Sequence, residues 1–252
     1  MPIATTSLIG LVAGVVIGAT GVGAGALMTP LLLQGFGLAL PLAVGTDLWF
    51  AALTKVSGSV AHHRRGHVEH RIVALLLAGS VPAALLTLAA LHAGWIPRSG
   101  SMGPALGVAL VLTAALVLAR GAWQRLAARL QWGARRRAVL TVLLGAAIGV
   151  LVTLSSVGAG AIGSSVIVLL YPELPARKLI GTDIAHAVPL TLIAGIGHAL
   201  LGHVDWALLG ALLLGSVPGI WIGTRLCSAL PERASRVGVS AALLLAGLKL
   251  IA

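Results

Sequence analysis

The stretch Gly45-Thr46-Asp47 returns later in the chain as Gly181-Thr182-Asp183, each time inside a long apolar segment. An ionised carboxylate within a bilayer is costly in free energy, so acidic residues there usually face a cavity or a partner group. Two such residues at equivalent places in two halves of a chain are typical of a transport site between structural repeats. The two motifs therefore predict a duplicated membrane protein whose halves meet at a binding site.

The composition indicates an all-α, multi-pass membrane protein. Of the 252 residues, 58% are hydrophobic and only 9% are charged, whereas a soluble domain carries about 25% charged residues. Several apolar runs reach the roughly 20 residues that a helix needs to cross a bilayer. The predicted segments lie at about 7–36, 39–60, 72–92, 103–119, 139–171, 176–200, 206–228 and 235–252.

The basic residues indicate contact with lipid rather than with nucleic acid. A formal net charge of +11 would suggest nucleic-acid binding in a soluble protein. Here most Lys and Arg residues lie between the apolar segments, where they orient the chain and contact acidic lipid. The expected partners are therefore membrane lipid and a small substrate, with no nucleic acid, and a homodimer is left open.

A fixed offset relates the two halves of the chain. The two Gly-Thr-Asp motifs are 136 residues apart, and the same offset relates Gly79-Ser80-Val81-Pro82 to Gly215-Ser216-Val217-Pro218. Val22-Gly23-Ala24-Gly25 returns as Val157-Gly158-Ala159-Gly160 at an offset of 135. An offset held over this length marks a duplicated four-segment unit. We predict repeat one at 1–119, a basic cytoplasmic linker at 120–138 and repeat two at 139–252.

The basic loops predict how the segments are oriented. If the first and fifth segments each enter the membrane and return to the same side, all four basic loops lie in the cytoplasm. Each repeat then crosses three times, so the two copies have opposite orientations, as in many secondary transporters. Glycine-rich breaks would supply the turns of these re-entrant segments. The basic loops are Arg64-Arg65 with Arg71, the linker, Arg177-Lys178, and Arg225 with Arg233 and Arg236.

The glycine runs of the first and fifth segments predict a backbone cradle for an anion. Glycine at alternate positions weakens a helix and suits a positive φ. A hairpin tip of this kind exposes backbone N–H groups at a helix N-terminus, which bind anions. The alternative is that these glycines only let helices pack closely. The predicted substrate-binding residues of the two runs are Gly21, Gly23, Gly25, Ser156, Gly158 and Gly160.

The motif residues themselves have two interpretations. Asp47 and Asp183 would take up and release the protons that drive transport, because a buried carboxylate can exist in either form. Thr46 and Thr182 would bind the substrate through their hydroxyls. Alternatively, these side chains hydrogen-bond to a broken helix or a hairpin amide and serve the fold alone.

Two further polar residues lie within apolar segments. Lys55 is the only Lys or Arg in such a segment away from its ends, and its counterpart in the second copy is Thr191. A lone positive charge near glycine amides indicates an anionic substrate, although a buried ion pair with an aspartate is the alternative. His186 follows Asp183 by one helical turn and replaces Phe50 of the first copy. It would share a proton with Asp183 or donate to the substrate.

Motifs for catalysis are missing from the sequence. It contains no Ser-His-Asp, nucleotide-binding or zinc-protease pattern, and its Asp and His residues do not have the close spacing of a metal site. We therefore predict no catalytic residues, no metal and no cofactor.

Residues spread over nearly the whole chain outside the linker match a known pattern. In the first half they are Gly21–Gly25, Leu27, Thr29, Pro30, Ala43–Leu48, Thr54, Lys55, Gly58, His62–Gly66 and Val68. In the second half they are Gly181–Ile184, His186–Pro189, Gly195, His198, Gly202–Trp206 and Gly215–Gly219. With these residues the chain resembles the TauE/SafE sulfite exporter family of membrane transporters. Many members have Thr-Ser where this chain has Thr-Asp, which places it in a Gly-Thr-Asp subgroup.

The resemblance implies export or uptake of sulfite, an organosulfonate, thiosulfate or a similar small anion, coupled to protons, in the inner membrane of a bacterium. It agrees with the anion site that Lys55 and the glycine runs indicate. Two alternatives remain open. One is a carrier of H⁺, Na⁺ or a metal ion that uses Asp47 and Asp183 as ligands, and the other is a membrane accessory protein that transports nothing.

Overall fold

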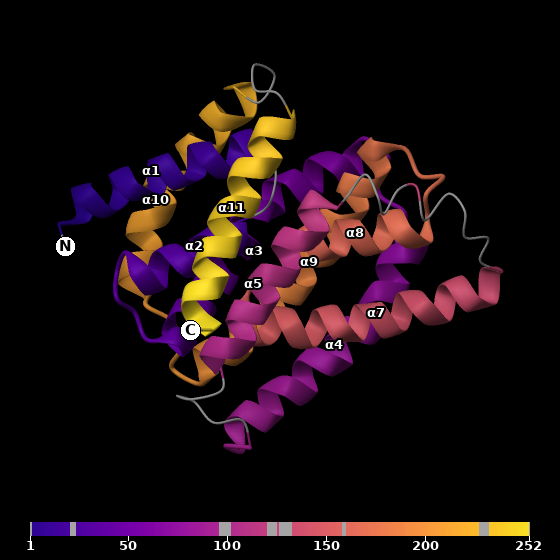
Figure 1. The fold of residues 1–252 in the computed structure, drawn as a ribbon, viewed down its shortest axis with the longest axis horizontal. Helices are drawn as coiled ribbons and strands as arrows, with labels where there is room; N and C mark the ends of the chain where they lie inside the picture. The colour runs from indigo at the N-terminus through magenta and orange to yellow at the C-terminus, as the bar shows by residue number, and fades with distance from the viewer. Residues whose placement is uncertain are drawn as a thin grey trace.

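The computed structural model describes residues 2–20, 24–95, 102–119, 125, 133–157, 160–226 and 232–251, and this part of the chain is helical without strands (Figure 1). The predicted all-α fold is confirmed. The helices of the first half are α1 (Ile3–Thr20), α2 (Ala24–Gln34), α3 (Leu40–Arg64), α4 (His70–His92) and α5 (Met102–Leu118). Those of the second half are α7 (Ala134–Ser155), α8 (Ala161–Leu170), α9 (Ala176–Leu200), α10 (Trp206–Leu226) and α11 (Glu232–Ile251).

Several of these helices have the length and apolar surface of membrane spans. Among the described residues, α4, α7, α9 and the Trp206–Gly223 part of α10 are long and apolar enough to cross a bilayer. Large apolar side chains point away from the protein, with Leu86 71% and Leu214 70% exposed. Such a surface would be unstable in water and is suited to lipid. The chain is therefore a multi-pass membrane protein.

The predicted fifth segment consists of two helices that fold back on each other. α7 ends at Ser155, and Ser156 adopts a left-handed conformation with φ of 57°. The end of α8 then returns to the beginning of α7, where the Tyr171 hydroxyl lies 2.9 Å from Thr141 Oγ1. Glu173 forms an ion pair with Arg137 nearby. α7 and α8 thus form a helical hairpin, which can be followed in Figure 1.

The first segment is likewise divided into α1 and α2. Its predicted glycine break at residues 21–23 lies outside the described residues, as does most of the predicted surface helix in the linker. The basic run Arg135–Arg137, which we assigned to the linker, belongs to the first turn of α7 because that helix already begins at Ala134.

In each half, one of the outer helices packs against a helix of the other half. α1 of the first half packs along α10 of the second, and α7 of the second half packs along α4 of the first (Figure 1). Glycines allow the close approach, since a Cβ on Gly215 would clash with the backbone oxygen of Ser7 and one on Gly79 with that of Val142. These contacts occupy matching positions, because Gly79 and Gly215 are related by the 136-residue offset. α5 and α11 pack against each other.

α3 and α9 pack together at the centre of the molecule and run antiparallel. The backbone of Gly45, near the start of α3, contacts His198 at the end of α9, whereas Gly181, near the start of α9, contacts His62 at the end of α3. Between these ends, Trp49 Nε1 donates a hydrogen bond to the Gly195 carbonyl at 2.9 Å. This pair of helices carries both Gly-Thr-Asp motifs.

Candidate functional site

The motif threonines tie the two halves together. Thr46 Oγ1 accepts a hydrogen bond from the backbone N–H of Asp205 at 3.0 Å, and Thr182 Oγ1 accepts one from the N–H of Glu69 at 3.0 Å. Both threonines are fully buried. Each therefore holds the loop before a helix of the other half, and each hydroxyl still has its own proton to donate.

Asp47 lies where α3 meets both broken segments. The fully buried carboxylate accepts a hydrogen bond from Thr29 of α2 through Oδ2, and Ser156 at the α7–α8 break lies beside it. Thr29 Oγ1 also lies 3.4 Å from the Ser155 carbonyl oxygen. Asp47 Oδ1 and Ser156 Oγ are both buried, and apart from the interaction between these two side chains they make no hydrogen bond within the described residues. The site thus combines a carboxylate with polar atoms that have capacity for a ligand.

Thr29, the hydrogen-bond partner of Asp47, was not among the predicted site residues. One signal was available, since Thr29 matches Ser164 at the 135-residue offset and places a hydroxyl at the same point of each broken segment. The hydrogen bond itself follows from packing between α2 and α3, which the sequence does not specify.

His186 lies in a second polar cluster with Asp183 on α9. Asp183 is 7% exposed and His186 is fully buried. His186 Nε2 lies 3.0 Å from Ser80 Oγ of α4, within hydrogen-bonding distance. At the repeat offset, His186 corresponds to Phe50 and Ser80 corresponds to Ser216. A phenylalanine and a serine side chain cannot hydrogen-bond to each other. The second half therefore has a titratable group where the first half has an aromatic ring.

Lys55 lies between the two aspartates and interacts electrostatically with both, as well as with His186. Because α3 and α9 are antiparallel, with Gly58 beside Ile184 and Gly181 beside His62, Asp183 lies level with about Val60. That is roughly 20 Å along α3 from Asp47 at 1.5 Å per residue. The structure thus does not bring the two carboxylates into one cluster. Lys55 is the charged group that connects them.

The predicted glycine cradle is described only at its edges. Gly21, Gly23 and Gly158 lie outside the described residues. Gly25 lies in the first turn of α2, and Gly160 directly precedes α8. The start of α8 is therefore close in sequence to Ser156, which lies beside Asp47.

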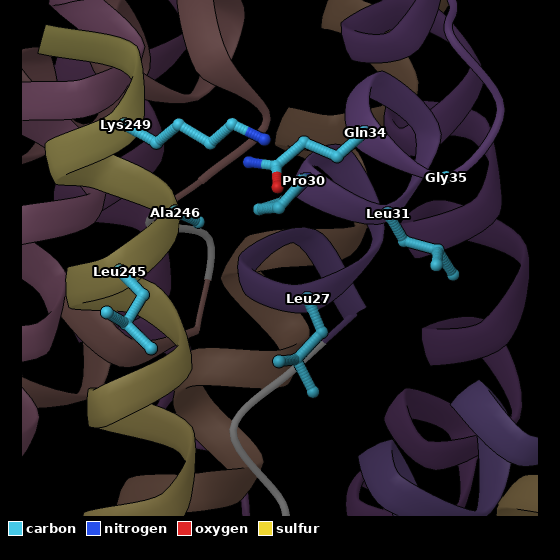
Figure 2. A pocket seen from close by; sticks show the side chains of 8 residues that line it. All are labelled: Leu27, Pro30, Leu31, Gln34, Gly35, Leu245, Ala246 and Lys249. Carbon is cyan, nitrogen blue, oxygen red and sulfur yellow. The ribbon is translucent and has the colours of Figure 1, made fainter. Parts of the chain in front are cut away.

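A groove of about 650 Å³ between α2 and α11 is separate from this site (Figure 2). Figure 2 shows Lys249 and Gln34 extending toward each other across it, and the other lining residues are apolar or glycine. None of its lining residues is a predicted site residue. The lining residues are Leu27, Pro30, Leu31, Gln34, Gly35, Leu245, Ala246 and Lys249.

The helical fold, the apolar outer surface and the buried charged residues on the central helix pair define a multi-pass membrane transporter. The chain belongs to the TauE/SafE family, because the family model described as "Sulfite exporter TauE/SafE" matches residues 6–250. The resemblance noted from the sequence is confirmed.

Two relatives from Bacillus subtilis (strain 168) match over nearly their full lengths. "Probable membrane transporter protein YjnA" is 36% identical over 250 residues, covering 97% of this chain and 98% of the relative. "Probable membrane transporter protein YdhB" is 28% identical over 242 residues, covering 94% and 96%. The family and these relatives are described as transporters rather than enzymes. No solved structure matches the chain.

Proposed function

We propose that the protein is a secondary transporter that moves a small sulfur oxyanion or an organosulfonate across the inner (plasma) membrane of a bacterium, coupled to protons. The observation that carries this proposal is the position of Lys55, which lies on the central helix pair between Asp47 and Asp183. A positive charge placed among carboxylates at the contact between two halves suits an anion that travels with protons. The description of the family as a sulfite exporter supports this substrate class.

Alternating access would arise from two inverted repeats, at 1–119 and 139–252. The antiparallel α3–α9 pair and the exchanged packing of α1 on α10 and α7 on α4 support this arrangement. In it, the α7–α8 hairpin and its counterpart α1–α2 enter the membrane and return to the same side. The hydrogen bond between Tyr171 and Thr141, which joins the two ends of the hairpin, supports the re-entrant path.

The anion would be bound by Lys55 and by neutral donors. Thr46 and Thr182 lie toward opposite ends of the α3–α9 pair, and each has a hydroxyl proton to donate because only its oxygen accepts a backbone N–H. Each would therefore bind the anion at a different stage of its passage. Ser156 and the amides of the glycine runs would supply further donors at the hairpin tips. At each stage, hydrogen bonds would replace part of the hydration shell of a small oxyanion, and Lys55 would supply a positive charge between the two ends.

Coupling to protons would follow from the charges of the site. When Asp47, Asp183 and Lys55 are all ionised, negative charge is in excess and an anion is repelled. A proton on either carboxylate neutralises this excess, and a proton on His186 would make the site attractive to an anion. Anion and proton would therefore bind together and move in the same direction.

The test is uptake of labelled sulfite by vesicles that contain the purified protein, driven by a pH gradient. Lys55→Ala should lower the rate by about a hundredfold, since a charged hydrogen-bonding partner contributes up to about 3 kcal/mol. Lys249→Ala removes a positive charge from α11, outside the site, and should leave the rate unchanged. An unaltered rate for Lys55→Ala would exclude Lys55 from the site. Flux of Na⁺ or a metal ion that ignores sulfite would favour the cation carrier instead.

A further inference from the structure

A cluster of basic side chains lies at one end of the α3–α9 pair, apart from Lys55. Here a cavity of about 580 Å³ is lined by His62, Arg65, His67 and Arg177. His62 belongs to the last turns of α3, Arg65 and His67 follow that helix, and Arg177 lies in the first turn of α9. All four lining side chains are therefore basic, and they come from both halves of the protein.

The positive charge of this cavity is not balanced by its own loop. Glu69, the acidic residue of the loop, accepts a hydrogen bond from Lys178 Nζ at 2.5 Å. Neither Arg65 nor Arg177 forms an ion pair with a carboxylate in the described part of the chain. Two guanidinium groups that share one cavity repel each other unless an anion lies between them. Arginine also matches the geometry of an oxyanion, because its planar fork donates two parallel hydrogen bonds.

The cavity adjoins the Gly-Thr-Asp motif of the second half. A Cβ on Gly181 would lie 3.1 Å from His62 Nδ1 and would clash with the backbone oxygen of His67. The residues that line the cavity therefore touch the backbone immediately before Thr182 and Asp183. An anion held here would be next to the proposed transport site.

The opposite end of the helix pair serves as an internal comparison. The positions that match the four lining residues are His198, Leu201, His203 and Pro41. His198 is fully buried, and its Nε2 lies 2.9 Å from the Thr153 carbonyl oxygen. The histidines thus occur at both ends, whereas the arginines occur at one. The fold does not need the arginines, since the other end forms the same contacts with Gly45 without them.

We propose that this cavity captures a small soluble oxyanion at one side of the transporter, with Arg65 and Arg177 as its main ligands. The proposal rests on the proposed transport function and adds a second, peripheral anion site to it. Binding in the cavity raises the local concentration of the anion beside Thr182 and Asp183, just as charged clefts concentrate the substrates of enzymes. The matching positions at the other end of the helix pair carry no arginine, so capture takes place on the side that the basic loops predict to be cytoplasmic.

The test separates the capture site from the central site by working in a Lys55→Ala background. Sulfite is titrated against the purified variant in a neutral detergent, and thermal stability is the readout. Sulfite should still stabilise Lys55→Ala, because the capture site is intact. Adding Arg65→Gln and Arg177→Gln should raise the half-saturating sulfite concentration at least about tenfold. A matched control adds Arg64→Gln and Arg135→Gln, two exposed arginines that do not line the cavity.

Two further arms make each outcome decisive. Replacing both cavity arginines by lysine keeps the charge but removes the fork, and should give an intermediate response in a protein that folds normally. Equal sulfite responses in the cavity and control variants would overturn the proposal. So would a sulfite response lost in nanodiscs with phosphatidylglycerol but kept in phosphatidylcholine, because a lipid phosphate would then occupy the cavity. If arginine-dependent binding is seen while wild-type vesicles move no oxyanion, the transport function fails and the anion site stands.

Discussion

The two Gly-Thr-Asp motifs share a backbone role but differ in their chemical surroundings. Each threonine accepts an N–H from the opposite half, and each glycine contacts a histidine of the opposite half. Near Asp47 the neighbours are hydroxyls and an aromatic ring, whereas Asp183 has His186 nearby and a basic cavity adjoining its motif. The features that both copies share therefore hold the fold. The charges that only one copy has are the ones that can distinguish a ligand.

The largest expected effect concerns the shared glycines. Gly79→Val and Gly215→Val each force a side chain into a backbone carbonyl of the facing helix. Both should lower the free energy of unfolding by about 3 kcal/mol or more, and by similar amounts. Thermal unfolding in detergent measures this, with Gly210→Ala as the control because nothing lies within 4 Å of its added Cβ. Tolerance of one change but not the other would show that the two contacts are not equivalent.

His186→Phe makes the second half resemble the first and sharpens the comparison between them. The change leaves Ser80 Oγ buried without its partner and should lower the free energy of unfolding by about 1–3 kcal/mol. Adding Ser80→Ala should recover most of that stability, whereas proton-driven uptake of sulfite should stay impaired in both variants. Uptake restored along with stability would make His186 a structural residue only.

The shared threonines should have smaller and equal effects. Thr46→Val and Thr182→Val each deprive one backbone N–H of its acceptor, which we expect to lower the free energy of unfolding by about 1 kcal/mol. Thr113→Val is the matched control, because among the described residues this buried threonine hydrogen-bonds to a carbonyl one turn earlier in its own helix and not to the other half. Unequal losses at Thr46 and Thr182 would break the symmetry between the two motifs.

The smallest effect concerns the ion pair between Glu69 and Lys178, which has no counterpart at Asp205 and Leu42. The two side chains are 35% and 41% exposed, so solvent screens their attraction. A double-mutant cycle with Glu69→Gln and Lys178→Gln should give a coupling energy below about 1 kcal/mol, falling as salt is added. A larger coupling that does not depend on salt would mean that the pair is shielded by other parts of the protein.

Much of the architecture could be predicted because it depends on local composition and on an internal repeat. Apolar runs predicted the all-α membrane fold, and its helices follow them closely. The repeat offset also identified which residues correspond. It could not show where corresponding residues lie in space, such as the separation of Asp47 from Asp183 along the helix pair. That separation follows from the antiparallel packing of α3 and α9, a tertiary feature.

The hydrogen bonds across the halves could not be predicted for the same reason. Thr46 and Thr182 were predicted to bind substrate, and their bonds to the loops at Asp205 and Glu69 became evident only when the halves were brought together. The basic cavity had a usable signal in the sequence. Arg65 and Arg177 are matched by Leu201 and Pro41 at the repeat offset, so the charges of one end stood out from the repeat.

The exchanged packing has a consequence for how the protein is made. α1 and α4 are synthesised before α10 and α7, the helices against which they pack. While the ribosome completes the second half, the first half inserts with glycine-bearing faces that have nothing to pack against. Assembly is therefore completed late, when the second half docks. Two separately translated halves that meet in one membrane should reconstitute the protein, whereas either half alone should be degraded.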